Sequence, residues 1–592
     1  MSKLKSVIVG IGVAAVTAGC SATVTTTSID ETPPLSGALT SFASCDEALA
    51  ELRANAAAHT PPMGWYPPEV EAFAEDAPAP TGGNARGNDP AIGGDEYSGT
   101  NTHETGVDEP DIVKTDGRRV VTAVDGVVRI VDAASGEAVG TVALDESVIG
   151  MSDLLLFGDR ALVVTTALNI ELHSEHSTAT TVYLVDLAGQ KVLNRFTIEG
   201  DYLDARAVDG VVRVVVRSQP VFVPTVDGDR RGAVMRTPID SWLPDYELDG
   251  EGGQIACTAL ARPTEYSGTS LLTLLTFDME AGLDDGTPVT VAADGNTVYG
   301  TGDALYIAND RGGFATVSWD LPVKAETELY RFGLGRETAP VLDASGAVPG
   351  YLLNQYSMSE WNGHLRVATT DSSDLVNSSS SVYMLEIGDG SLTEVGRVEG
   401  LGLGERIYAV RYVGDAGYVV TFRQVDPLYV LDLRDPAAPK ALGELKITGY
   451  SSYLHPVSDT RLLGVGQEAD DSGRTQGTQI SLFDVSDASN PTRLDQYHVP
   501  GSSTSVEIDP HAFLYWPGES IAVIPVQEYG SAAAATVVSV GDTTLSELAT
   551  VEVGSGSAVR NLVIGEHLWT FSHDGYAITT LSDFETVGWF TY

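Results

Sequence analysis

Short apolar strands recur along the chain from about residue 111 onward, separated by turns rich in Gly, Asp and Asn. One kind of strand returns repeatedly and in most copies ends in an acidic residue before a turn, as in VVRIVDA (127–133), TVYLVDL (181–187), LYVLDL (428–433) and ISLFDV (480–485). An apolar strand precedes each copy, and a further strand follows most of them. Short strands bounded by turn residues, with little helical periodicity between them, are typical of an all-β fold.

These strands form a repeat whose copies begin about 40 to 90 residues apart, the longer spacings carrying insertions. The two best copies, YVLDLRDPAAPKALGEL and SLFDVSDASNPTRLDQY, share the pattern Asp-x-x-Asp-x-x-x-Pro, which begins at Asp432 and at Asp484. Asp side chains bond to the backbone N–H groups that follow them, and Pro cannot donate within a strand. The shared pattern therefore indicates a turn, and we interpret these aspartates as turn formers rather than catalytic groups.

Four short antiparallel strands per unit, repeated many times, predict a β-propeller. Each blade of such a fold buries both faces against its neighbours, and closure of the ring removes exposed edges. The sequence holds nine candidate units, of which one can be a fragment or share a blade with another. The predicted fold class is therefore all-β: a single large β-propeller over 106–592, with about eight blades and seven to nine allowed, preceded by a short helical segment.

The N-terminus has the pattern of a targeting signal, residues 1–19. Two lysines precede the apolar stretch 6–19, which at about 14 residues is too short to span a bilayer as a permanent helix. Ala18-Gly19-Cys20 resembles a bacterial lipobox, although Thr17 stands where Leu or Val is usual. That resemblance implies lipidation of Cys20. We predict an extracytoplasmic protein anchored to the cell membrane by an N-terminal lipid, with secretion as the alternative.

Three segments of different composition separate this signal from the strands. Residues 20–43 are rich in Thr, Ser and Pro and are predicted to be a flexible tether. Residues 44–76 contain good helix formers and are predicted to be a short helical segment. Residues 77–105, rich in Pro, Gly, Asn and acidic residues, are predicted to be a linker.

The helical segment carries one of the two cysteines that remain besides Cys20. SCDE (44–47) fits a capping box and predicts a helix over about 44–57, with a second helix near 68–76. Outside the cell, Cys45 and Cys257 tend to pair, and their disulfide would tie the helix to the main body. Two buried free thiols are the alternative.

Composition limits the partners. With 592 residues, 43% of them hydrophobic, the chain can bury a sizeable core. Its 82 acidic and 34 basic residues give a net charge of −48, and no nucleic acid partner is expected because phosphate binding needs clustered Lys and Arg. The acidity indicates solubility in salt-rich surroundings, and cation binding by acidic loops is the alternative.

Five motifs stand out: YSGTNTHETGVDEPDIVKTDGRRVV (97–121), VPGYLLNQYSMSEWNGHLRVATT (348–370), GERIYAVRYVGDAGYVVTFRQVDPLYVLDLRDP (404–436), YLHP (453–456) and PHAFLY (510–515). They resemble the motifs of a family of secreted bacterial and archaeal proteins with a C-terminal β-propeller distantly related to WD40 repeats. The resemblance covers about 100–590 and implies the propeller fold and secretion, but no activity. The charged residues within its motifs that we assign to the family pattern are Asp111, Lys114, Asp116, Arg366, Arg423 and Asp426.

The acidic stretch THETGVDEPDIVKTD (102–116) is the first candidate site. DIVKTDGRRVV is predicted to be a hairpin, and buried polar contacts of this stretch would lock the chain where it enters the propeller. The alternative is a calcium site, because calcium needs six to eight oxygens held in a loop. Its carboxylates and histidine would be His103, Glu104, Asp108, Glu109 and Asp111, although the Asp-x-Asp-x-Asp-Gly spacing is missing.

A second acidic run lies in the longest insertion, 217–270. DYELDGE places Asp245, Glu247, Asp249 and Glu251 at period two, on one face if the segment is a strand. Four carboxylates on one face repel each other unless they are solvated or bridged by a cation. A solvated insertion loop and a calcium site are the two interpretations, and calcium is the only cofactor that the sequence suggests.

Histidines and buried arginines add further candidates. His173 and His176 form a loop pair that is predicted to be solvated rather than a zinc site. His455 and His511, in the motifs YLHP and PHAFLY, are either core histidines bonded to the backbone or point into the central channel. Four arginines in apolar strands are predicted to form ion pairs with carboxylates such as Asp371, Glu405 or Asp426, because buried arginines need partners; these are Arg366, Arg406, Arg411 and Arg423.

Enzyme signatures are mostly absent, so an enzyme is not favoured. No Gly-x-Ser-x-Gly motif occurs, since GYSSY (449–453) lacks its last Gly, and no phosphate-binding loop occurs. We predict a binding module for an envelope protein, peptide or glycan, with the membrane contacted only through the lipid anchor. The alternatives are an extracytoplasmic hydrolase or lyase-like enzyme with acidic residues in the propeller channel, and an envelope assembly scaffold.

Overall fold

The fold is described from a computed structural model. It describes residues 40–59, 96–169, 177–220, 229–257, 259–263, 269–311, 325–336, 338–371, 378–423, 426–470, 472–554 and 557–592. All of them belong to the compact unit Leu35–Tyr592. The signal 1–19, Cys20, the predicted helix near 68–76 and the pair His173 and His176 lie outside the described residues.

The described strands form eight hydrogen-bonded sheets; four of them are four-stranded antiparallel meanders, and the others contain such meanders with added strands or, in one case, two meanders joined. The first three meanders are β2 (Val113–Thr115), β3 (Arg119–Val124), β4 (Val127–Asp132) and β5 (Ala138–Ala143); β6 (Asp153–Phe157), β7 (Arg160–Asn169), β8 (Ser177–Asp186) and β9 (Lys191–Glu199); and β10 (Asp201–Val208), β11 (Val211–Ser218), β15 (Leu271–Asp278) and β16 (Val289–Ala292).

One sheet is eight-stranded and contains two meanders, joined by parallel pairing of β20 with β24. These two are β17 (Thr297–Gly300), β18 (Ala304–Arg311), β19 (Glu326–Gly333) and β20 (Val341–Pro349); and β21 (Met358–Trp361), β22 (His364–Asp371), β23 (Ser379–Ile387) and β24 (Gly390–Leu401). The next two are β25 (Arg406–Val413), β26 (Ala416–Phe422), β27 (Asp426–Asp432) and β28 (Lys440–Ile447); and β29 (Tyr450–Ser458), β30 (Arg461–Ala469), β31 (Thr475–Asp484) and β32 (Thr492–Pro500).

The last two meanders complete the series. They are β34 (Leu514–Trp516), β35 (Ile521–Glu528), β36 (Ala534–Val540) and β37 (Leu545–Val551), where β33 (Ser502–Ser503) also pairs with β35; and β38 (Ala558–Ile564), β39 (His567–Ser572), β40 (Gly575–Thr580) and β41 (Thr586–Thr591). Short 3₁₀ turns lie at η2 (Ile239–Ser241), η3 (Gln355–Ser357), η4 (Ser505–Glu507) and η5 (Pro510–Ala512).

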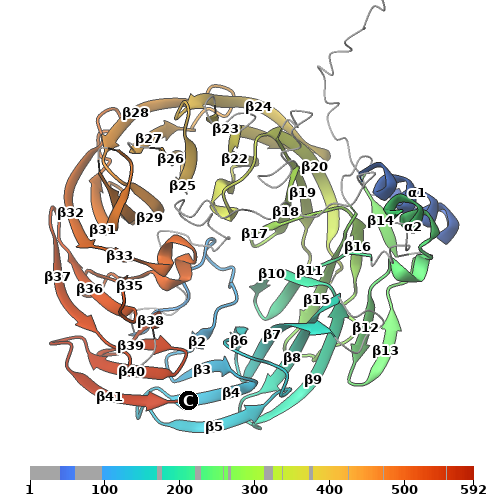
Figure 1. The fold of residues 1–592 in the computed structure, drawn as a ribbon, viewed down its shortest axis with the longest axis horizontal. Coiled ribbons are helices and arrows are strands. Elements are labelled where there is room, and N and C mark those ends of the chain that lie inside the picture. Colours follow the sequence, from blue (N-terminus) through green and yellow to red (C-terminus); the bar gives the residue numbers. More distant parts are fainter. Residues whose placement is uncertain are drawn as a thin grey trace, which may run out of the picture. The chain divides into compact units, whose positions relative to one another are not determined.

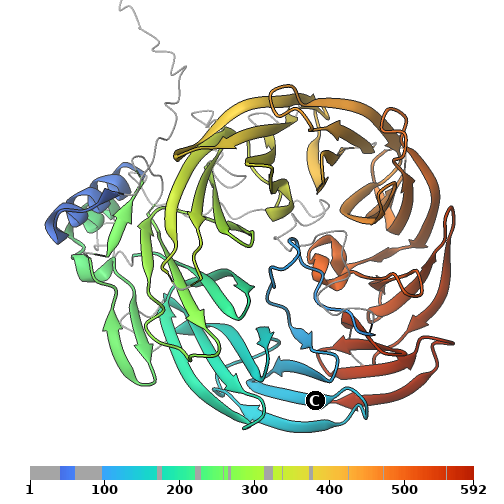
Figure 2. The ribbon, with the colours of Figure 1, turned by 180° about the vertical axis from the view of Figure 1, so that it is seen from behind.

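The meanders follow one another around a ring, with the first strand of each innermost (Figure 1, Figure 2). Each is joined to the next by an apolar cluster; the first such cluster packs Val121 and Val128 against Leu154 and Val163. A further cluster packs Val120 of the first meander against Trp569 of the last and so closes the ring. The described residues therefore form nine blades, and the predicted propeller is confirmed at the upper end of the predicted range.

Tight turns between the first and second strands of several blades depend on left-handed backbone. In the turn after β10, Asp209 and Gly210 have φ of 49° and 78°, and in the turn after β21, Asn362 and Gly363 have 50° and 77°. Positive φ at both central residues defines the two-residue hairpin turn that matches strand twist, and Asp-Gly and Asn-Gly adopt it most readily. These Asp-Gly and Asn-Gly pairs therefore form the hairpin turns that connect the first and second strands of their blades.

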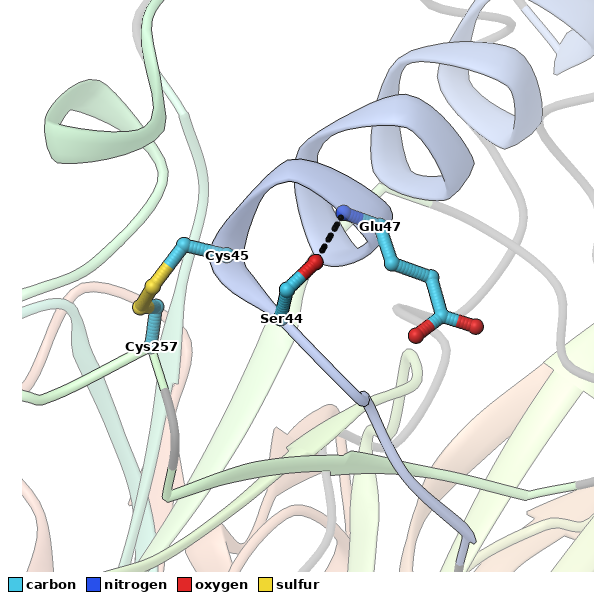
Figure 3. Close-up of a disulfide and its surroundings, with 4 residues drawn as sticks. All are labelled: Ser44, Cys45, Glu47 and Cys257. Carbon is cyan, nitrogen blue, oxygen red and sulfur yellow. Dashed lines mark hydrogen bonds between the residues drawn. A yellow bond between two sulfur atoms is a disulfide. The ribbon is translucent and has the colours of Figure 1, made fainter.

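The N-terminal helix packs beside the long insertion, on the outer side of the third blade. Helix α1 (Cys45–His59) and helix α2 (Arg230–Arg236) share an apolar cluster that includes Leu52, Val234 and Trp242. Ser44 Oγ accepts a hydrogen bond from the N–H of Glu47 at 3.1 Å, as the predicted capping box requires (Figure 3). Among the described residues, no helix is long and apolar enough to cross a membrane.

Cys45 and Cys257 form a disulfide between α1 and the insertion, with Cα atoms 5.5 Å apart (Figure 3). The insertion also adds strands to two blade edges. β12 (Asp245–Leu248) and β13 (Glu251–Gln254) extend the second blade, and β14 (Leu260–Arg262) with β1 (Thr40–Ser41) extends the third. The tether predicted over 20–43 is therefore corrected at its end, because Thr40 and Ser41 pair with β14.

Candidate functional site

The chain before β2 runs through the centre of the ring of blades, where both views show it in pale blue (Figure 1, Figure 2). We call residues 97–112 the channel segment. Its backbone forms antiparallel bridges to the innermost strands of three blades, at Tyr97 with Ile564, Asp108 with Ala207, and Asp111 with Leu154. The linker predicted over 77–105 is therefore corrected in its last part, because Tyr97 and Ser98 pair with the last blade and the chain after them runs inside the ring.

Glu109 is the most enclosed carboxylate of the channel segment, with 1% of its surface exposed. Its Oε1 lies 3.8 Å from Nε of Arg206 and accepts from the N–H of His103 at 3.0 Å, while its Oε2 lies 3.1 Å from Nε2 of His511. Burial alone would raise the pKa of Glu109, but Arg206 and the bonds from His511 and His103 outweigh it and lower the pKa to about 2. Glu109 is therefore a permanent anion that joins three parts of the chain.

Arg560 holds a second carboxylate of the channel segment. Its Nε donates to Oδ1 of Asp111 at 2.6 Å, and its Nη2 donates to Oδ2 of Asp509. Burial would raise the pKa of Asp509, but Arg560 and His511 lower it. The pKa of His511 is in turn raised, because its bond to Glu109 and the charges of Asp111 and Asp509 outweigh the opposing effect of burial. These groups form one network of alternating charge.

The walls of the channel contact the segment at further points. Asn101 Nδ2 donates to Tyr453 Oη at 3.1 Å and to the carbonyl of Pro510 at 3.0 Å. The ring of His103 lies between the rings of Tyr299 and Tyr356, with centroids 5.0 and 4.9 Å away. Blades from all around the ring therefore hold the segment, and this agrees with the locking interpretation of the sequence.

Lys114 and Asp116 of the family motif follow the segment into the first blade. The buried ammonium of Lys114 donates to Asp108 Oδ1 at 2.6 Å, to Thr100 Oγ1 at 2.7 Å and to the carbonyl of Glu109. Asp116 accepts from the N–H of Arg119 at 2.9 Å and from its Nε at 3.0 Å, which closes the predicted hairpin turn. Both residues therefore have structural partners in the motif itself.

Asp153, at the start of β6, differs from its neighbours in the channel. It is only partly buried, and its carboxylate forms neither a hydrogen bond nor a salt bridge with any described residue. Burial and the nearby carboxylates of Asp111 and Asp204 raise the pKa of Asp153 to about 6. A carboxyl group with a pKa in this range can exchange a proton near neutral pH.

The second acidic run has exposed surroundings. Glu247 pairs with Arg195 at 3.3 Å, with both side chains about 40% exposed, and Asp249 accepts from the N–H of Arg195 at 2.8 Å. Asp245 accepts from Nε2 of Gln254 at 2.8 Å. Within the described ranges, no group of three or more His, Cys, Asp and Glu residues is placed to hold a metal ion. Protein cations and amides face both acidic runs instead.

Arg366, one of the arginines in the apolar strands, differs from its predicted ion pairing. Among the described residues Arg366 forms no salt bridge; it donates to Ser359 Oγ at 2.7 Å and to the carbonyl of Gly414, and it lies over the ring of Tyr412 at 4.7 Å. Stacking on an aromatic face can replace a carboxylate partner. Arg423 is exposed, and the side chain of Asp426 lies outside the described part.

The two predicted histidines lie in different environments. His511 belongs to the channel network, whereas His455 packs against the rings of Phe513 and Tyr515 and its Nδ1 lies 3.1 Å from Tyr453 Oη. Burial and the nearby guanidinium of Arg411 lower the pKa of His455 to about 3, so this imidazole is neutral.

Sequence reasoning missed the three partners that hold the network together: Arg206, Asp509 and Arg560. One structural feature positions Arg206. Arg206 lies two residues after a β-bulge in the first strand of its blade, and Arg411 occupies the same position in another blade. A bulge re-aims side chains, but it is not visible in a single sequence.

A pocket of about 440 Å³ lies where the channel segment meets the inner strands of the first three blades and β38. Its apolar lining includes Leu155, Leu156, Phe157 and Met279. Its charged lining consists of Asp108, Lys114, Asp116 and Asp209. Apolar walls with a few polar groups and a volume in this range are typical of sites for small ligands.

Nine four-stranded blades around a channel that the chain itself occupies define a β-propeller. The chain belongs to the family described as "Beta propeller domain", whose model matches residues 97–584. An uncharacterized protein of Archaeoglobus fulgidus is 28% identical over 83% of this chain and 84% of that protein. A second uncharacterized protein, MJ1554 of Methanocaldococcus jannaschii, is 41% identical over 38% of this chain and 35% of its own length.

Solved structures with a likeness to the chain include two bacterial proteins. Apo AztD from Citrobacter koseri matches with a TM-score of 0.34 and 10% identity, over 79% of this chain and 93% of that chain. The periplasmic gluconolactonase PpgL of Pseudomonas aeruginosa matches with a TM-score of 0.35 and 11% identity, over 54% of this chain and 91% of that chain. Similarity at this level carries no information on function.

Proposed function

We propose that the protein is an extracytoplasmic binding module, anchored to the membrane through a lipid on Cys20, that engages an envelope protein, peptide or glycan. The observation that carries the proposal is the occupied channel. Glu109, Asp111 and Asp509 are held by arginines and by His511, so most of the charged groups where a propeller channel could do chemistry are already bound to the protein itself. Recognition by shape and a few anchors at the surface remains as the best supported activity.

The test uses the soluble body, residues 21–592 with Cys20 removed, as the immobilised partner. Its association with a detergent-solubilised envelope fraction is measured before and after protease treatment and before and after periodate oxidation. We expect saturable binding that one of the two treatments abolishes, which assigns the ligand to protein or glycan. No saturable binding from any fraction would overturn the proposal. Fractionation of the full chain beside a Cys20→Ser variant tests the anchor, because only the lipidated chain should remain with the membrane.

One observation favours an enzyme as the second candidate. Asp153 is partly accessible, has a pKa raised to about 6, and lies beside Asp204 and Asp509. A carboxyl group of this kind can act as a general acid or base near neutral pH. If the soluble body turns over an envelope glycan, and Asp153→Asn abolishes turnover but retains binding, the protein is an enzyme and the proposal of a binding module is wrong.

A further inference from the structure

The hydrogen-bond donors on the charged wall of the pocket beside the channel segment are already engaged by the protein, whereas some acceptors are not. Lys114 uses its ammonium on Asp108, Thr100 and the carbonyl of Glu109. Thr115, also in the lining, donates its hydroxyl to the carbonyl of Arg119 at 2.8 Å. The donors of the charged wall are therefore engaged, and the wall offers a ligand few hydrogen-bond donors.

Acceptors remain available on the same wall. Asp108 receives Lys114 and the N–H of Glu109 on its Oδ1, while its Oδ2 receives no hydrogen bond from a described residue. Asp209 is 77% exposed, and its contact with Arg336, 64% exposed, is 3.8 Å long. Such a pair is weak in water, so the carboxylate of Asp209 is nearly uncompensated. A ligand that donates hydrogen bonds and carries positive charge fits these groups.

Charge and shape point in the same direction. Three aspartates and one lysine line the pocket. Lys114 pairs with Asp108 and Arg119 pairs with Asp116, so the weakly compensated carboxylate is that of Asp209. The apolar part of the lining includes aliphatic side chains, Phe157 and Met279. An ion in water gains little from one surface carboxylate, but an apolar body beside it adds binding energy in proportion to the area buried. The lining therefore selects an amine attached to an apolar group over a small inorganic cation or an anion.

We infer that this pocket takes a protonated amine on an apolar body, the chemistry of a peptide N-terminus or lysine side chain next to a hydrophobic residue. The inference rests on the proposed binding function and selects peptide among its three ligand classes. The amine lies toward Asp209 and Asp108, and the apolar body packs on Leu156, Phe157 and Met279.

The test compares three probes with the same ring and different charge: phenethylamine, 3-phenylpropionate and 2-phenylethanol. Their dissociation constants with the soluble body are measured by ligand-observed NMR titration at low salt. Phenethylamine should bind in the millimolar range or tighter and more strongly than the other two, and added salt should weaken it. If 2-phenylethanol binds more tightly than phenethylamine, or if glucose binds and phenethylamine does not, the pocket is assigned to a hydroxyl-rich ligand and the inference is overturned.

Variants place the site. Asp209→Asn keeps the left-handed backbone, which Asn tolerates, and should weaken phenethylamine by about two- to fivefold, the contribution of one surface ion pair. Asp209→Lys should reverse the preference toward 3-phenylpropionate. The matched control is Asp459→Asn, an exposed aspartate in the corresponding turn of another blade, which should change nothing. Equal effects of Asp209→Asn and Asp459→Asn would overturn the assignment to this pocket.

Failure of this inference and failure of the proposed function have different signatures. If the envelope ligand binds the wild type and Asp209→Lys equally, the binding module stands and the pocket is not its peptide site. If no envelope fraction binds at all but phenethylamine binds in an Asp209-dependent way, the pocket recognises amines and the proposed envelope partner is wrong. Loss of both removes both proposals.

Discussion

Two acidic runs of this chain look alike in sequence and have opposite surroundings in the structure. In the channel segment, Glu109 and Asp111 are 1% and 2% exposed and face Arg206 and Arg560. In β12, Glu247 is 40% exposed and faces an Arg195 that is exposed to the same extent. Carboxylate density alone therefore predicts neither a cation site nor a buried network. The residues that meet the carboxylates from other blades decide the outcome.

The comparison also separates two roles of charge. A buried carboxylate requires a fixed cation, and removing that cation leaves an isolated charge in a poorly solvated place. An exposed pair is exchanged for water at little cost. The channel network should therefore be important for folding, whereas the β12 pairs should matter mainly for solubility in an acidic protein.

The largest effect is expected from Arg560→Ala. The change leaves Asp111 and Asp509 without their guanidinium and should lower the free energy of unfolding by about 3–5 kcal/mol, measured by urea denaturation of the soluble body. The matched change Arg195→Ala, in the exposed run, should cost about 0–1 kcal/mol. Equal losses in the two variants would remove the distinction between the runs.

A somewhat smaller effect is expected from Glu109→Gln, which keeps the shape and removes the charge. The pKa of His511 should fall, because its hydrogen bond to the Glu109 carboxylate is the main influence that raises it. NMR titration of the His511 ring against wild type measures the change, and Glu247→Gln serves as the control that should leave it unaltered. An unchanged pKa of His511 in Glu109→Gln would show that the two groups do not interact.

The pH dependence of stability tests the channel groups together. The folded-state pKa of Asp153 is raised to about 6 and that of His511 is raised as well, so the folded state binds more protons, and their contribution to stability is lost as pH rises through these values. The Tm should therefore increase as pH falls from about 7.5 toward 5. Below about pH 4 it should decrease, because Glu109 and Asp509 have lowered pKa values.

Asp153→Asn provides the control for that curve. The variant removes a carboxylate that burial and its neighbours disfavour, so it should raise the Tm near neutral pH and flatten the rise between neutrality and pH 5. A wild-type Tm that falls steadily from neutrality to pH 5 would contradict the assigned protonation states.

The smallest effect, none, is expected from calcium. Within the described residues no group of three or more suitable side chains is placed for a metal ion, and the carboxylates of both runs accept from protein groups. Millimolar calcium and excess chelator should leave the Tm unchanged at constant ionic strength, whereas a ligand of the folded state would raise it with concentration. A rise with calcium that chelator reverses would restore the calcium interpretation of Asp108, Glu109 and Asp111 or of Asp245, Glu247 and Asp249.

The fold was predictable because it is repetitive. The strand pattern that recurs from VVRIVDA onward marks the third strand of a blade in eight of the nine units counted in the sequence. The remaining unit, 315–321, lies outside the described residues, and the third strand of its blade is β19. The boundary near residue 97 was not predictable, because Gly- and Asn-rich residues look like a linker when their pairing partner, β38, lies more than 450 residues away.

The candidate site could be predicted only in part. Locking by the THETGVDEPD stretch follows from its many polar groups, but Arg206, His511 and Arg560 lie in separate blades, and local pattern gives no sign that they meet. The ion pair predicted for Arg366 was wrong for a related reason. The guanidinium lies over the ring of Tyr412, and a stacking partner of this kind cannot be recognised in the sequence by its charge.

A double-mutant cycle between Asp111 and Arg560, residues 449 positions apart, tests most directly whether the channel segment locks the ring. The free energies of unfolding of Asp111→Ala, Arg560→Ala and the double variant are compared with wild type, beside a parallel cycle on Glu247 and Arg195. We predict a coupling of about 2 kcal/mol in the channel and under about 0.5 kcal/mol in the exposed pair. A coupling near zero between Asp111 and Arg560 would contradict the account.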